Sequence, residues 1–157
     1  MPYRVLVLTI VALALVALAL RVVRLQDRPP HTDESVNAWI LGRVLAGKPF
    51  AFDPRDRHGP ILPAAGLVTA ALLGRRTFAE LDERAIRLAP AVVGAAATGL
   101  FLLGSGMIPH GTLAGSAALW AVSPLPLYYG RYAIHETLLV AATLAFLLTL
   151  ARAFFAD

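Results

Sequence analysis

The sequence predicts an all-α polytopic membrane protein. We expect about four transmembrane helices, a re-entrant or fifth helix, and an amphipathic helix at the membrane interface. Hydrophobic residues make up 58% of the 157 residues and charged residues only 15%, whereas soluble domains carry roughly 25% charged residues. Several apolar runs approach the length needed to cross a hydrocarbon core of roughly 30 Å. Arginine gathers at the ends of these runs, as is typical of membrane proteins.

The charge balance agrees with this class. Fourteen Lys and Arg against ten Asp and Glu give a formal net charge of +4. A basic chain could bind nucleic acid, but here the basic residues are scattered at the ends of apolar segments, so we expect no nucleic-acid partner. The chain has no cysteine, which excludes disulfides and thiolate metal ligands.

The first span is predicted at residues 5–23. Its length matches a hydrocarbon core at 1.5 Å rise per residue. A cleaved signal peptide is the alternative, but the apolar run is longer than a signal core and Arg21-Val22-Val23-Arg24 is a poor cleavage site. We therefore expect an uncleaved anchor with Arg4 in the cytoplasm, which places the loop over residues 24–60 outside it.

That loop is the only long hydrophilic segment, and it contains the predicted interfacial helix, from Glu34 to Ala46. Thr32 or Asp33 is expected to cap the helix and Gly47 to end it. Its apolar residues recur at helical spacing; they are Val36, Trp39, Ile40, Val44 and Leu45. A tryptophan on this side favours a position along the membrane surface.

The next apolar stretch, residues 60–73, is too short for an ordinary span and favours a re-entrant or interfacial helix. If it crossed the membrane, Asp33 and the loop Arg131–Glu136 would lie on opposite faces; if not, they would share one face. The pair Arg75-Arg76 favours crossing, because positive residues in short loops prefer the cytoplasm. We give more weight to the length and expect a shared face.

Three further spans are predicted at residues 88–108, 111–127 and 137–155. Pro124 and Pro126 end the second of these. Tyr128 and Tyr129 follow it and suit a membrane interface. Arg152 lies near the end of the last span, where its head group can reach the membrane surface.

The candidate catalytic residues are Asp33, Glu34 and Glu136. Each has two readings. Acids at a helix start complement the helix dipole and cap the helix. Alternatively, a carboxylate at the membrane surface can serve as a general base or bind a cation. Both readings hold together if the cap fixes the position of the reactive group.

The candidate phosphate-binding residues are His58, Arg87, Arg131 and His135. A solvated loop accounts for His58, and ordinary anchoring of a span end accounts for Arg87. The functional alternative is that these groups face the phosphate of a lipid head group, which favours charged donors. Ionisable groups at the border of apolar spans are costly and often functional.

Four motifs occur in a recognisable order. Asp33-Glu34 follows the first span, and His58-Gly59-Pro60 opens the next apolar stretch. Arg87-Leu88-Ala89-Pro90 stands at a span start, and Ser123-Pro124 is followed by Tyr128-Tyr129-Gly130-Arg131-Tyr132 and Glu136. In this order the chain resembles the N-terminal part of a GT-C fold glycosyltransferase of the protein-mannosyltransferase and aminoarabinose-transferase kind. The likeness is greatest to the flippase-associated mannosyltransferase-like subfamily.

The resemblance implies transfer of a hexose or pentose from a polyprenyl-phosphate carrier, at extracytoplasmic loops of a multi-pass protein of the cell membrane. It implies that Asp33 is the catalytic base or lies beside the acceptor, and that Glu136 binds acceptor or cation. Basic groups, matched by His58, Arg131 and Arg87, would hold the lipid phosphate. Members of the family have more spans, so the chain is expected to be a fragment, inactive without the rest of the transferase or a partner membrane subunit.

Two other functions fit the same pattern. One is a non-catalytic accessory subunit in the handling of lipid-linked oligosaccharides. The other is a transporter, because buried arginine and glutamate also mark substrate pathways. A divalent cation would fit near the acids, but two carboxylates and a histidine are too few ligands to define its site.

Overall fold

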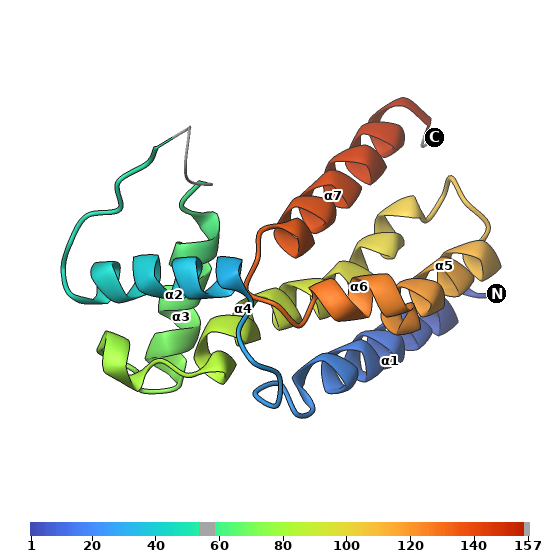
Figure 1. The fold of residues 1–157 in the computed structure, drawn as a ribbon. Coiled ribbons are helices and arrows are strands. Elements are labelled where there is room, and N and C mark those ends of the chain that lie inside the picture. The colour runs from blue at the N-terminus through green and yellow to red at the C-terminus, as the bar shows by residue number, and fades with distance from the viewer. Residues whose placement is uncertain (54–58, 156–157) are drawn as a thin grey trace.

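The computed structural model describes residues 1–53 and 59–155. Within these ranges the protein is all-helical, as predicted, with 73% helix and no strand. The α-helices are α1 (Tyr3–Val22), α2 (Thr32–Leu45), α3 (Ile61–Leu72), α4 (Glu83–Ala96), α5 (His110–Val122), α6 (Pro124–Tyr129) and α7 (Glu136–Phe155). Two 3₁₀ segments, η1 (Phe78–Glu80) and η2 (Ala97–Gly104), lie on either side of α4 (Figure 1).

Three helical segments of the described chain are long and apolar enough to cross a membrane: α1, α4 continued by η2, and α7. α1 packs against α4 and α5 to form a bundle. α2 and α3 lie at one end of this bundle, whereas both chain termini lie toward the other (Figure 1). The elements that were expected to carry the function are thus gathered at one end.

The predicted span over 111–127 differs from expectation, because it is two helices separated at Ser123. Pro124 has no N–H, so the carbonyl of Trp120 loses the donor that a continuous helix would supply. Ser123 is extended, with φ −60° and ψ 138°, and α6 starts at Pro124. The prolines therefore end α5, as predicted, but helical structure resumes at once.

Arg21 of α1 fills the gap that this break leaves. Its side chain is fully buried and donates to the carbonyls of Ala17, Trp120, Ala121 and Pro126 at 3.0–3.5 Å. The carbonyls of Trp120 and Ala121 lie in the last turn of α5, where cationic side chains interact favourably with the helix dipole. A buried charge in an apolar bundle is thus compensated by backbone oxygens rather than by a carboxylate.

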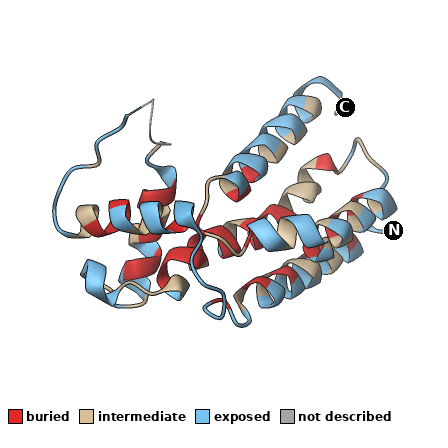
Figure 2. Cartoon of the chain, viewed as in Figure 1, coloured by how far each residue is buried: buried red, intermediate tan, exposed pale blue. Residues whose placement is uncertain are grey.

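Small residues allow the helices of the bundle to approach closely. Ala17, Ala95 and Ala121 form a buried cluster between α1, α4 and α5, as is typical of helix contacts in membranes. A second cluster joins α1 and α5 through Leu6, Ile10, Leu113 and Ala117. Buried residues lie on all three of the helices that pack together, α1, α4 and α5 (Figure 2).

α7 differs from the other long helices in that only 6% of its most apolar 18-residue window is buried. It leans away from the bundle (Figure 1) and is mostly exposed along its length (Figure 2). Exposed apolar side chains such as Leu139, Phe146 and Phe154 suit contact with lipid, since lipid is their natural solvent.

The predicted cap of α2 is wrong by one or two residues. The helix starts at Thr32, and His31 is its N-cap: the Nδ1 atom accepts from the Asp33 N–H at 3.3 Å. In return, the His31 N–H donates to Glu34 at 3.0 Å, which completes a capping box. α2 ends at Leu45 rather than Ala46, and Gly47 follows with φ 74°, a conformation that glycine adopts without strain.

α3 has 12 residues, so its length is about 18 Å at 1.5 Å rise per residue. This is well short of a hydrocarbon core of roughly 30 Å. α3 packs against α2 and α4, and the Thr69 hydroxyl donates to the Ala85 carbonyl at 2.7 Å. The chain therefore enters α4 at the end of the bundle where it left α1 (Figure 1).

Candidate functional site

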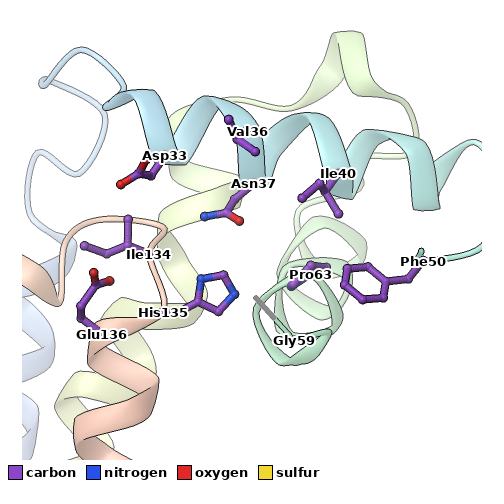
Figure 3. A pocket seen from close by; sticks show the side chains of 10 residues that line it. All are labelled: Asp33, Val36, Asn37, Ile40, Phe50, Gly59, Pro63, Ile134, His135 and Glu136. Carbon is purple, nitrogen blue, oxygen red and sulfur yellow. The ribbon is translucent and has the colours of Figure 1, made fainter. Parts of the chain in front are cut away.

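A cavity of about 250 Å³ lies where α2, α3 and the start of α7 meet. Its polar wall carries Asp33, Asn37, His135 and Glu136 (Figure 3). The rest of the lining is made by Val36, Ile40, Phe50, Gly59, Pro63 and Ile134. A small solute with both polar and apolar faces would fit this cavity.

The structure brings Asp33 and Glu136 to the same cavity, although they lie far apart in the sequence. Asp33 belongs to the first turn of α2, and Glu136 is the first residue of α7. The Asp33 side chain is 68% exposed, so its carboxylate is open to a solute. The Nδ1 atom of the His31 ring lies 3.6 Å from Asp33 Oδ2. Two of the three predicted acids therefore line one cavity.

Glu34 points the other way and does not line the cavity. Its side chain is fully buried and accepts two hydrogen bonds from Arg87, both at 2.8 Å. It also accepts from the N–H groups of Ala133 at 2.8 Å and His31 at 3.0 Å. Burial raises the pKa of Glu34, but these four hydrogen bonds and the charge of Arg87 outweigh it and hold the pKa below its usual range. Glu34 makes no contact with the cavity that would support its predicted catalytic role.

The hydrogen-bond donors of Arg87 are likewise engaged within the protein. Beyond its two bonds to Glu34, it donates to the carbonyls of Leu25 at 2.8 Å, Arg28 at 3.0 Å and Pro29 at 3.2 Å. A guanidinium has five N–H donors, and all five are used. Arg87 thus ties α4 to the loop after α1 and to the start of α2, and it offers no donor to a phosphate in this arrangement.

Arg131 also binds the backbone. It donates to the carbonyl of Leu20 at 2.8 Å, in the last turn of α1, and to that of Arg24 at 3.0 Å, just after the helix. Burial lowers the pKa of Arg131, and so do the nearby charges of Arg28 and Arg87. Of the other predicted phosphate ligands, His135 lines the cavity and His58 lies outside the described residues.

A cluster of arginine and tyrosine lies beside these residues and was not predicted. The guanidinium of Arg28 is 5.2 Å from the ring centroid of Tyr128 and 5.7 Å from that of Tyr132, within the range of cation–π attraction. Tyr132 has a lowered pKa, because it is hydrogen-bonded to Tyr128 and faces Arg28. The order of Arg28 and the tyrosines in the sequence gives no sign of this contact.

A second cavity, of about 310 Å³, adjoins the first through Glu136. It lies between α5, α6 and α7, and its walls are almost wholly apolar. They are formed by Trp120, Leu125, Pro126, Tyr129, Thr137 and Val140 together with Glu136. A polar and an apolar cavity that share one acid would together fit an amphiphilic molecule.

In the described part of the chain, no three His, Asp or Glu side chains gather closely enough to hold a metal ion. The chain was also compared with family models, with curated proteins and with solved structures. None of the three comparisons gives a match. The likeness to GT-C glycosyltransferases therefore depends on the motifs in the sequence alone.

Proposed function

We propose that this chain forms the whole or part of a membrane glycosyltransferase that takes a sugar from a polyprenyl-phosphate carrier. The observation that supports it is the cavity that Asp33 and Glu136 share at one end of an apolar bundle. The adjoining apolar cavity strengthens the proposal, because a lipid-linked sugar has a polar head and an apolar chain.

In the proposed reaction, an acceptor hydroxyl attacks the anomeric carbon of the sugar while Asp33 takes the hydroxyl proton. A bond forms between the acceptor oxygen and the anomeric carbon. The bond from that carbon to the phosphate oxygen breaks, and its electron pair leaves with the polyprenyl phosphate. Glu136 orients the acceptor, and His135, which lines the same cavity, is the proposed donor to the phosphate.

Arg28 and Arg131 contribute a positive field rather than direct contacts, whereas the charge of Arg87 is offset by its ion pair with Glu34. Arg131 donates to carbonyls of the chain itself, and carbonyls do not neutralise its charge. A positive field favours the phosphate charge that grows as the sugar departs. In keeping with an anchor whose first residues are cytoplasmic, we propose that this end of the bundle is extracytoplasmic.

The test uses membrane vesicles from the native host, in which the chain is present with any partner membrane subunit, and polyprenyl-phosphate mannose or arabinose labelled in the sugar, with membrane extract as acceptor. The measurement is transfer of label and release of polyprenyl phosphate. Asp33→Asn should lower the rate about 100-fold or more, the usual effect of losing a general base. Asp27→Asn is the matched control, since Asp27 pairs with Arg24 at the surface and does not line the cavity. Equal rates for Asp33→Asn and the unmodified chain would refute the proposal.

A non-catalytic accessory subunit is the second candidate. It is favoured by the engagement of Glu34, Arg87 and Arg131 in bonds that hold the fold rather than a ligand. This function predicts no transfer by the chain under any donor, and association with a partner transferase that survives Asp33→Asn. Loss of association on Glu34→Gln, with Asp33→Asn unaffected, would be its signature.

A further inference from the structure

One residue of the loop before Glu136 is held at both of its backbone groups by α2. Ala133 lies in the loop between α6 and α7 and is 2% exposed. Its N–H donates to Glu34 Oε1 at 2.8 Å, and its carbonyl accepts from the Asn37 side chain at 2.9 Å. Both backbone groups of this residue are thus held by side chains of α2.

The positions of Glu34 and Asn37 on α2 explain why both can bind Ala133. Residues three or four apart lie on the same helix face. Glu34, Asn37 and Leu41 follow this spacing, and Leu41 packs in the same apolar cluster as Ala133. Asp33 lies four residues before Asn37, and both line the cavity. Asn37 therefore belongs both to the face that holds Ala133 and to the face that carries Asp33.

Ala133 is only three residues before Glu136, so fixing Ala133 also restricts the position of Glu136. Three residues of extended backbone span at most about 10 Å. If Ala133 is fixed to α2, Glu136 is restricted to a small volume beside Asp33. If it is released, the start of α7 is held less tightly, because Thr137 and Ala141 are the buried residues that α7 itself provides.

We propose that Asn37 is a positioning residue that sets the separation of Asp33 and Glu136 by holding the Ala133 carbonyl. Glu34 acts with it from the N–H side. The role in catalysis depends on the proposed function, but the role in geometry does not. Asn37 does not need to contact the reacting atoms, since its amide is already bound to the backbone.

The test measures the separation directly. The chain has no cysteine, so spin labels can be placed at Asp33→Cys and Glu136→Cys in the full chain, in lipid nanodiscs. Pulsed electron resonance then gives the distribution of distances. With Asn37 present we expect one narrow distribution. With Asn37→Leu, which keeps the branching of the side chain and removes its donor, the width should increase roughly twofold or more, as a released tether of about 10 Å allows.

Two controls separate positioning from loss of fold. Val36→Ala alters the cavity wall without touching Ala133 and should leave the distribution unchanged. Labels at the exposed Leu8 and Leu119 of α1 and α5 should report the same distance in Asn37→Leu as in the unmodified chain. An unchanged distribution between positions 33 and 136 in Asn37→Leu would overturn the proposal.

An activity measurement completes the test, with the acids restored. If sugar transfer occurs, Asn37→Leu should lower kcat more than it raises KM, and Asn37→Gln, which keeps a donor, should restore part of the rate. Equal kcat in Asn37→Leu and the unmodified chain would count against positioning. Absence of transfer by every variant would refute the proposed function and leave the distance result intact.

Discussion

The buried pair of Glu34 and Arg87 should dominate the stability of the site end. We consider Glu34→Gln, which keeps the shape of the side chain and removes its charge. The change leaves Arg87 without a counter-ion in a position where its side chain is 1% exposed. Removing one partner of a buried ion pair usually costs about 3–5 kcal/mol, because the other charge stays buried.

The amide group of the glutamine would also clash with the hydrogen-bond donors that surround Glu34. The carboxylate accepts from the N–H groups of Ala133 and His31 as well as from Arg87. A glutamine has one oxygen and an NH₂ group that must face one of these donors. We therefore expect a loss at the upper end of that range, and a fall in melting temperature of about 10 °C.

The assay is thermal unfolding in detergent, followed by circular dichroism, for Glu34→Gln, Arg87→Met and the double variant. The double variant should lose less stability than the two single losses combined, since neither charge is then left alone. Asp27→Asn is the control at an exposed pair, where the expected effect is about 0–1 kcal/mol. A loss below about 1 kcal/mol for Glu34→Gln would refute the idea that this pair holds the site end together.

Three other predictions concern Glu34, Gly130 and Arg131. Because folding lowers the pKa of Glu34, the ionised carboxylate stabilises the fold above its unfolded pKa of about 4.3, and this stabilisation is lost as the pH falls through the folded pKa. Unfolding measured from pH 7 to 3 should show this loss of stability, and Glu34→Gln should show less of it. Gly130→Ala should cost about 1–3 kcal/mol by overpacking, because its Cβ would lie 2.7 Å from Arg21 Nε, whereas Gly111→Ala has open space and should be neutral in the same melts. Arg131→Ala should release the end of α1, seen as faster hydrogen exchange there but not in α5; equal exchange in both forms would contradict the contact.

The sequence predicts the helices well because apolar run length is a strong signal. It fails where backbone oxygens decide the structure. Ser123 breaks the predicted span over 111–127, and Arg21 satisfies the break from another helix. A carbonyl carries no side-chain signature, so such partners cannot be found from composition or spacing. His31 was missed as a cap for a different reason, since histidine is not among the preferred N-cap residues.

The site was predictable in part. The short 60–73 segment predicts that Asp33 and Glu136 share one membrane face; both line one cavity in the structure, and their membrane face stays a prediction. Segment length could not assign Glu34, because adjacent residues on a helix point about 100° apart and only one of the two acids can face the cavity. Asn37 could have been found, since it lies four residues from Asp33 on the same helix face. The role of Arg131 could not, as its partners are backbone carbonyls, and the pairing of Arg87 with Glu34 could not, because the two residues lie far apart in the sequence.

The central claim is that Asp33 and Glu136 lie at the same membrane surface, outside the cytoplasm. The most direct test is labelling of single cysteines at these two positions in intact cells with a maleimide that does not cross membranes. The account predicts that both react from outside, and that a cysteine at Tyr3, toward the opposite end of the bundle, does not. Reaction of one position from outside and the other only after permeabilisation would contradict the shared site. Protection of both would contradict the sidedness and place this arginine-rich end in the cytoplasm, where positive residues are usually found.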